Sequence, residues 1–155
     1  AGVVLGDARL ELARMPKGGL DLLAVDAFSS DAIPLHLMTD EAMGVYLDAL
    51  SPQGILLVHI SNRYIDLEPV LAAIARKRGL SALIRDDEIG GEVGSYFTGS
   101  TWVAIARSPD RMAALRQVDP SRPWRPLGPP ARRAWTDDHA SILTQVRWGS
   151  LLGQK

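Results

Sequence analysis

The sequence predicts an α/β fold, a mostly parallel sheet with helices on both faces. Short, mainly apolar runs recur at residues 2–5, 20–25, 55–60, 81–84 and 101–106. Segments with the apolar spacing of amphipathic helices separate most of these runs. A strand–helix–strand unit of this kind forms a right-handed parallel crossover. The continuous apolar character of the central runs is typical of strands that are covered on both faces.

The composition is that of a folded domain with a near-neutral charge. The chain has 155 residues, 46% of them hydrophobic, and a formal net charge of −1. This charge balance argues against nucleic acid as a partner. The lack of cysteine excludes disulfides and thiolate metal sites, and it agrees with a cytoplasmic location. No apolar run approaches the roughly 20 residues that a membrane-spanning helix needs.

Two longer helices are predicted from their end signals. Thr39 is a favourable N-cap, and the helix after it buries one apolar face before residues 51–54 end it. Asp66 is the expected N-cap of the second helix, and Gly79 is its natural C′ residue. A shorter helix is expected at residues 8–15, before Pro16.

The C-terminal part of the sequence predicts different structure. The runs at 81–84 and 101–106 have no helix between them, which favours an antiparallel hairpin at one sheet edge. Five of the ten prolines lie between residues 120 and 130. We therefore expect a domain over residues 1–119, followed by a non-helical tail over residues 120–155 that ends in a short helix at 138–148.

Polar residues follow three of the predicted strands, where open α/β sheets bind ligands. These segments are residues 6–9, 26–31 and 59–63. Asp26 and Asp31 are the strongest candidates, because one carboxylate can accept a proton from an amine while the other holds an ammonium group. The alternative is structural: Asp26 caps a loop and Asp31 belongs to a turn.

Other polar residues favour structural interpretations. Asp7 is suited by its type to cap the helix that begins at residue 8. The three histidines, His36, His59 and His139, lack metal-ligand spacing, and single histidines are more often hydrogen-bonded structural residues. The Gly-rich stretch at 90–94 lacks the Lys-Ser/Thr of a phosphate loop. No metal site is predicted.

The order of these motifs resembles the polyamine aminopropyltransferases, the spermidine synthase family. The matching segments are residues 6–9, 22–26 and 50–56. A bacterial branch, in which a spermidine-synthase-like domain is often fused to membrane-transporter-like helices, is more similar still. The segments similar to that branch are residues 26–31, 34–37, 59–64 and 135–138.

The resemblance implies a Rossmann-like fold of the class I methyltransferase type, of which this chain holds the C-terminal portion. Asp26 matches the aspartate that acts as general base on the attacking amine. Asp7 and Ala8 match the pair that contacts the adenine of the nucleoside, and Pro34 matches a proline of the adenine pocket. The Gly-rich nucleoside loop, the ribose-holding acidic residue and a small β-domain are expected before residue 1.

The loop after Asp26 is expected to bind the substrate through Ser29, Ser30 and Asp31. Asp31 stands for the second substrate-holding aspartate of the family. In typical members that aspartate lies three positions after the base, whereas here it lies five positions after it. The departure bears on which amine is accepted.

The resemblance also implies the reaction and the partners. The co-substrate is decarboxylated S-adenosylmethionine, the acceptor is a diamine or polyamine, and the full-length protein is a transferase. A methyltransferase that uses S-adenosylmethionine and a non-catalytic module that senses a nucleoside or polyamine remain as alternatives. Exposed sheet edges favour a homo-oligomer, and the parent protein is expected to carry membrane segments.

Overall fold

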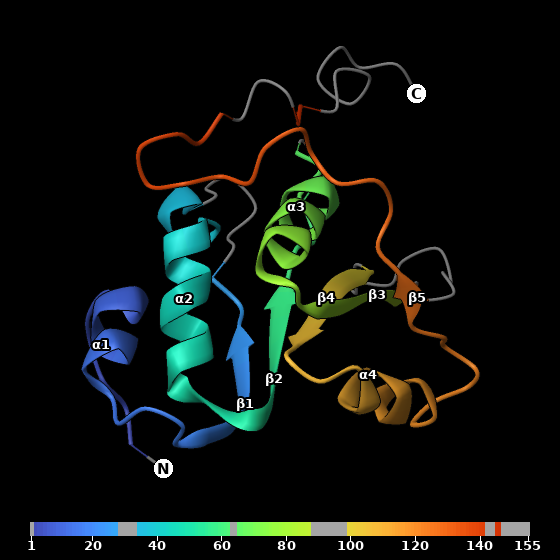
Figure 1. The fold of residues 1–155 in the computed structure, drawn as a ribbon, viewed down its shortest axis with the longest axis horizontal. Helices are drawn as coiled ribbons and strands as arrows, with labels where there is room; N and C mark the ends of the chain where they lie inside the picture. The colour runs from blue at the N-terminus through green and yellow to red at the C-terminus, as the bar shows by residue number, and fades with distance from the viewer. Residues whose placement is uncertain (1, 28–33, 63–64, 88–98, 142–144, 147–155) are drawn as a thin grey trace, which may run out of the picture.

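The computed structural model describes residues 2–27, 34–62, 65–87, 99–141 and 145–146. They form a mixed sheet with four α-helices (Figure 1). No described helix combines the length and hydrophobicity that a membrane span requires. In chain order the elements are α1 (Ala8–Arg14), β1 (Leu20–Val25), the 3-10 turn η1 (Leu35–Leu37), α2 (Asp40–Ala49), β2 (Leu50–His59), α3 (Glu68–Arg78), β3 (Ser81–Asp87), β4 (Ser100–Ala106), α4 (Pro109–Arg116) and β5 (Arg125–Pro126).

The sheet has the strand order β1-β2-β4-β3-β5. β1 and β2 are parallel, whereas β4 is antiparallel to both of its neighbours and β5 is antiparallel to β3. The expectation of a mostly parallel sheet is therefore wrong for the described strands. β3 and β4 pair antiparallel, as predicted. β4 lies inside the sheet rather than at its edge, because its other side pairs with β2.

Helices cover both faces of this sheet. On one face, α2 and α3 pack in the main apolar cluster, which includes Val58 of β2 and Val103 of β4. On the other face, Met112 of α4 packs against Leu83 and Ala104. Successive residues of a strand point to opposite faces, so the central strands supply apolar side chains to both clusters.

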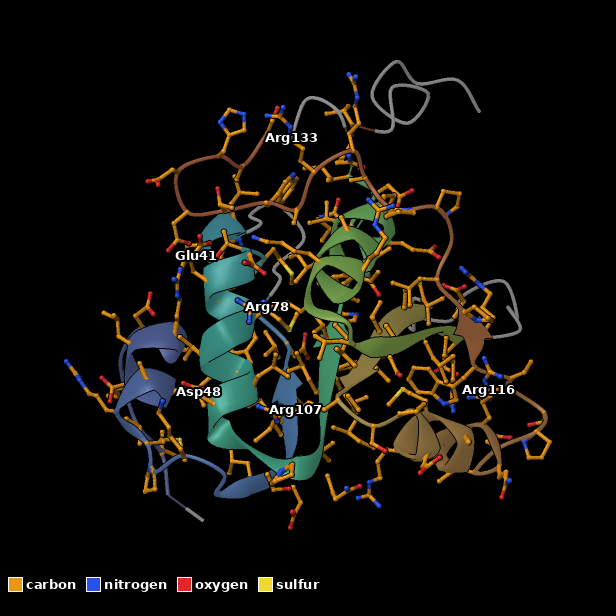
Figure 2. The ribbon with its side chains drawn as sticks, in the orientation of Figure 1. Glu41, Asp48, Arg78, Arg107, Arg116 and Arg133 are labelled. Carbon is orange, nitrogen blue, oxygen red and sulfur yellow. The ribbon has the colours of Figure 1, made fainter. Side chains whose placement is uncertain are left out.

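The start of α2 and the end of α3 follow their sequence signals, whereas residues 51–54, which were expected to end α2, belong to β2. Thr39 caps α2 by accepting the N–H of Ala42, and Gly79 ends α3 in the left-handed conformation with a φ of 65°. The expectation that Asp66 is the N-cap of α3 is wrong by one residue, because Leu67 holds that position; Asp66 accepts the N–H of Glu68 at 3.2 Å. Arg107, which follows β4, donates to carbonyls at the C-terminal end of α2 (Figure 2).

Two expected elements differ in the structure. Residues 2–5 form no strand, and Val3, Val4 and Leu5 are exposed. Their apolar side chains have no neighbouring strand to pair with among the described residues. The expected helix at 138–148 is wrong for its described residues, because His139 forms a turn with Thr136 and Val146 forms a bridge with Ile65.

The segment after α4 is anchored in the core. Trp135 is 4% exposed and packs in the main apolar cluster. Its carbonyl accepts the N–H of Asp40 at 2.8 Å, and the N–H of Ala131 donates to the carbonyl of Pro69. Figure 1 shows this segment crossing the N-terminal ends of α3 and α2, at the edge where β1 and β2 end.

Candidate functional site

The parallel pairing of β1 and β2 brings Asp26 beside His59. Val25 is level with Val58 in the register, so the residues that follow them are neighbours at the carboxyl end of the sheet. Oδ1 of Asp26 lies 2.7 Å from Nδ1 of His59. The side chain of Asp26 is 59% exposed, and that of His59 is 20% exposed. Asp26 thus lies where the strand pattern predicts it, with its carboxylate open to solvent.

His59 is held on its other sides by β4 and by its own strand end. Its Nε2 lies 2.6 Å from Oγ of Ser61, and that oxygen accepts the N–H of Thr101 at 2.7 Å. Trp102 is the register partner of His59 across the β2–β4 pair. The two rings stack with their centroids 4.8 Å apart. Both ring nitrogens of His59 are therefore hydrogen-bonded, as expected of a structural histidine. One of the two partners is Asp26, the candidate base.

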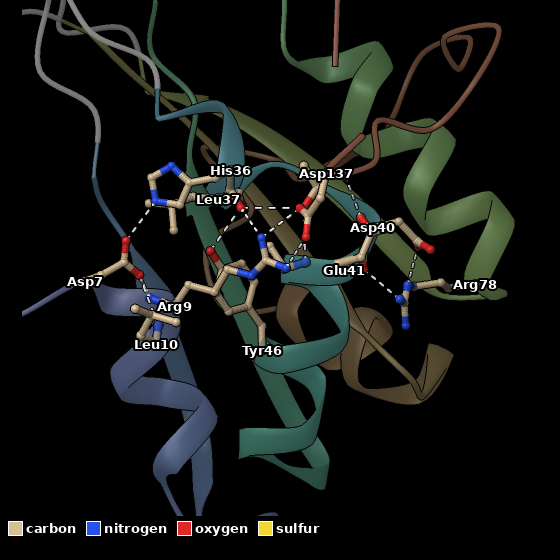
Figure 3. Close-up of polar contacts among 12 residues, drawn as sticks. Asp7, Arg9, Leu10, His36, Leu37, Asp40, Glu41, Tyr46, Arg78 and Asp137 are labelled. Carbon is tan, nitrogen blue, oxygen red and sulfur yellow. Dashed lines mark hydrogen bonds and ion pairs between the residues drawn. The ribbon is translucent and has the colours of Figure 1, made fainter. Parts of the chain in front are cut away.

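Asp7 caps α1, as its residue type predicts. One oxygen accepts the N–H groups of Arg9 and Leu10 at 2.9 and 3.0 Å, and the other lies 3.2 Å from Nε2 of His36 (Figure 3). The Leu10 hydrogen bond is the main cause that lowers the pKa of Asp7. The contact with His36 joins the start of α1 to η1. Asp7 and Ala8, the expected adenine contacts, are thereby connected to the turn that follows Pro34, the expected residue of the adenine pocket.

Asp137 is the centre of a second polar cluster, which the sequence analysis does not predict. Arg9 donates two parallel hydrogen bonds to it at 2.8 and 2.6 Å (Figure 3). Thr39 donates a third at 2.7 Å. The hydrogen bonds from Arg9, followed by that from Thr39, lower the pKa of Asp137 to about 2. The motif at residues 135–138 was the available signal, but nothing in the sequence identified Arg9 as its partner.

A cavity of about 420 Å³ lies beside this cluster. Its lining includes Arg9, His36 and Thr39 from the N-terminal half of the chain, together with Asp137 and Asp138. The cavity therefore adjoins the Asp7–His36 contact. It offers hydrogen-bonding groups of both charges to a polar ligand.

Several expected site residues lie outside the described part of the chain. They are Ser29, Ser30 and Asp31. Among the residues that the structure describes, no group of three or more side chains could hold a metal ion. The chemistry that the described site offers is that of a carboxylate backed by an imidazole, which suits proton transfer.

The fold is similar to that of a solved structure, a probable spermidine synthase from Corynebacterium glutamicum ATCC 13032. The TM-score is 0.57 at 14% sequence identity, and the match covers 89% of this chain. It covers 56% of the other protein, so this chain spans a little over half of that protein's length. No protein-family model matches the sequence, and no curated protein does. The chain therefore has a spermidine-synthase-like fold.

Proposed function

We propose that this chain carries the catalytic base of an aminopropyltransferase that transfers an aminopropyl group from decarboxylated S-adenosylmethionine to a diamine or polyamine. The observation that supports the proposal most is the position of Asp26. Its solvent-exposed carboxylate follows β1 at the carboxyl end of the sheet, and His59 holds it there at 2.7 Å. The likeness to a probable spermidine synthase agrees with this chemistry.

The reaction requires a single proton acceptor. The acceptor amine reaches the site as an ammonium ion and loses one proton to Asp26. The freed nitrogen lone pair attacks the carbon beside the sulfonium, a C–N bond forms, and the C–S bond breaks with its electron pair moving to sulfur. The products are a neutral thioether and a secondary ammonium ion. Since the sulfonium is already a good leaving group, positioning and deprotonation supply the catalysis.

The other expected residues take binding roles in this proposal. Asp7 and Ala8 contact the adenine, and Pro34 lines its pocket. Ser29, Ser30 and Asp31, which follow the base in the sequence, hold the second ammonium group of the acceptor. A diamine is a suitable acceptor because one nitrogen can be held by a carboxylate while the other reacts.

The test supplies the purified protein with putrescine and with either decarboxylated S-adenosylmethionine or S-adenosylmethionine. Mass spectrometry then identifies the product. We expect spermidine and methylthioadenosine from the decarboxylated donor. A methylated amine from S-adenosylmethionine would instead support the methyltransferase alternative, which shares this fold class.

The base assignment is tested by Asp26→Asn, which keeps the shape of the side chain. Loss of a general base costs about 100- to 10,000-fold in rate. Asp21→Asn is the matched control, because Asp21 is an exposed aspartate of the same strand that bonds to Ser51. Spermidine formation by Asp26→Asn at the wild-type rate would show that Asp26 is not the base.

A further inference from the structure

We infer that His59 is the positioning residue for Asp26, and that the stack on Trp102 and the bond to Ser61 fix the imidazole for this role. The inference rests on the proposed function, since it assigns a second residue to the same reaction. His59 does not contact the reacting atoms in this arrangement. It acts through the carboxylate that does.

The contacts of His59 leave one carboxylate oxygen free for the substrate. Oδ1 of Asp26 is engaged by Nδ1 of His59, and within the described part of the chain Oδ2 makes no hydrogen bond. An exposed aspartate without such a partner samples several rotamers, and holding one of them requires a rigid support. Here the support is rigid, because Trp102 stacks on the imidazole from the neighbouring strand.

The hydrogen bonds around His59 accommodate both protonation states of the ring. In the neutral ring, Nδ1–H donates to Asp26 and Nε2 accepts the hydroxyl proton of Ser61. In the protonated ring, both nitrogens donate, and only the hydroxyl hydrogen of Ser61 has to turn. Both states of the ring therefore keep the contacts with Asp26 and Ser61.

The charged groups near this ring lie at the end of β1 and on β3. Asp26 contacts it from the end of β1. On β3, Arg85 is the register partner of Trp102, and Asp86 accepts a hydrogen bond from the hydroxyl of Thr101 at 2.9 Å. Of these groups, Asp26 is the one in direct contact with the imidazole.

The order Asp26, His59, Ser61 also has the connectivity of a hydrolytic triad. The oxygen of Ser61 argues against a nucleophilic role, because it accepts the backbone N–H of Thr101 at 2.7 Å. That bond ties the hydroxyl to β4 and makes Ser61 an anchor for the ring. Hydrolysis of an activated ester such as p-nitrophenyl acetate by the wild type, abolished in Ser61→Ala, would overturn the positioning role.

The kinetic test compares two substitutions that separate hydrogen bonding from stacking. His59→Phe keeps a ring against Trp102 but removes the bond to Asp26, whereas His59→Asn keeps an N–H donor near the position of Nδ1. Loss of a partner that orients a metal-ligating side chain costs about 10- to 100-fold in activity or affinity. We expect that loss in the kcat of His59→Phe, with an unchanged KM and an altered acidic limb of the pH profile. His59→Asn should recover most of the kcat.

His139→Gln is the matched control, because His139 is exposed and lies outside the proposed site. It should keep the wild-type kcat and pH profile. Wild-type kcat and pH profile in His59→Phe would refute the inference. Loss of activity in His59→Asn to the level of His59→Phe would also refute it, because an N–H group near the position of Nδ1 would then not restore the function of Asp26.

A measurement without turnover separates this inference from the proposed function. The ¹⁵N shifts of the His59 ring, recorded where the ring is neutral, report which nitrogen carries the proton. We expect the Nδ1–H tautomer in the wild type and its loss in Asp26→Ala, with no change at His139. Suppose that neither S-adenosylmethionine nor its decarboxylated form yields product, but that the tautomer depends on Asp26. The proposed function then fails and the His59–Asp26 coupling stands. A tautomer that is unchanged in Asp26→Ala would refute the coupling.

Discussion

Asp26 and Asp137 are two partly exposed aspartates with opposite surroundings. Both oxygens of Asp137 accept hydrogen bonds from Arg9, and Thr39 adds another. Asp26 is bonded by His59 alone among the described residues. Their side chains are 42% and 59% exposed, so exposure does not separate them. Their hydrogen-bond partners distinguish the two residues. Both oxygens of Asp137 are bonded to other segments of the fold, whereas one oxygen of Asp26 remains available to accept a proton.

The largest expected effect on stability lies beside Asp137. Trp135 is buried in the main apolar cluster, and truncating a buried Trp costs about 3–5 kcal/mol. We expect Trp135→Ala to lower the free energy of unfolding by that amount in urea titrations. Trp124→Ala is the control, because Trp124 is only partly buried, against the smaller cluster of the other face. Equal losses in both variants would contradict the anchoring role of the segment that carries Asp137.

Thr39 links that segment to α2 through its hydroxyl, which also lies 3.5 Å from the carbonyl oxygen of His36. It accepts the N–H of Ala42 and donates to Asp137. Removing an N-cap of this kind costs about 1 kcal/mol. We expect Thr39→Ala to lose that amount in thermal or urea unfolding, and Thr39→Ser, which keeps the oxygen, to lie closer to the wild type. If Thr39→Ser were as unstable as Thr39→Ala, the effect would come from the methyl group instead.

The smallest expected effect is a pH dependence of stability. The pKa of Asp137 is lowered from 3.8 to about 2 in the folded state, first by its hydrogen bonds with Arg9. A lowered folded pKa stabilises the protein above the unfolded value, and this stabilisation is lost as the pH falls towards 2. The urea midpoints of the wild type and Asp137→Asn should therefore differ most at neutral pH and converge between about pH 4 and pH 2. A difference that persisted at low pH would contradict the ion pair, and Asp138→Asn controls for the loss of one negative charge.

The parts of the fold that could be predicted depend on local sequence. Thr39 and Gly79 mark helix ends through their own backbone chemistry, and Asp26 could be placed because it follows an apolar strand. The insertion of β4 between β2 and β3 could not be predicted, because strand order depends on contacts between residues distant in the sequence. The same holds for the Arg9–Asp137 pair, whose members are 128 positions apart.

The role of His59 illustrates the limit within the site itself. Its position at a strand end can be predicted from the apolar run before it, and its residue type favours a structural role. Its partner could not be identified, because the contact with Asp26 follows from the parallel register of β1 and β2. The stack on Trp102 likewise requires the antiparallel register of β2 and β4.

The most direct test measures transfer rate and urea midpoint together in Asp26→Asn and Asp137→Asn at neutral pH. We predict that Asp26→Asn loses at least about 100-fold in kcat, with a midpoint equal to that of the wild type. Asp137→Asn should show the reverse, a lowered midpoint with a kcat of wild-type order for the folded protein. A wild-type rate in Asp26→Asn, or a lowered midpoint in that variant as the cause of its lost activity, would contradict the assignment of Asp26 to chemistry and Asp137 to structure.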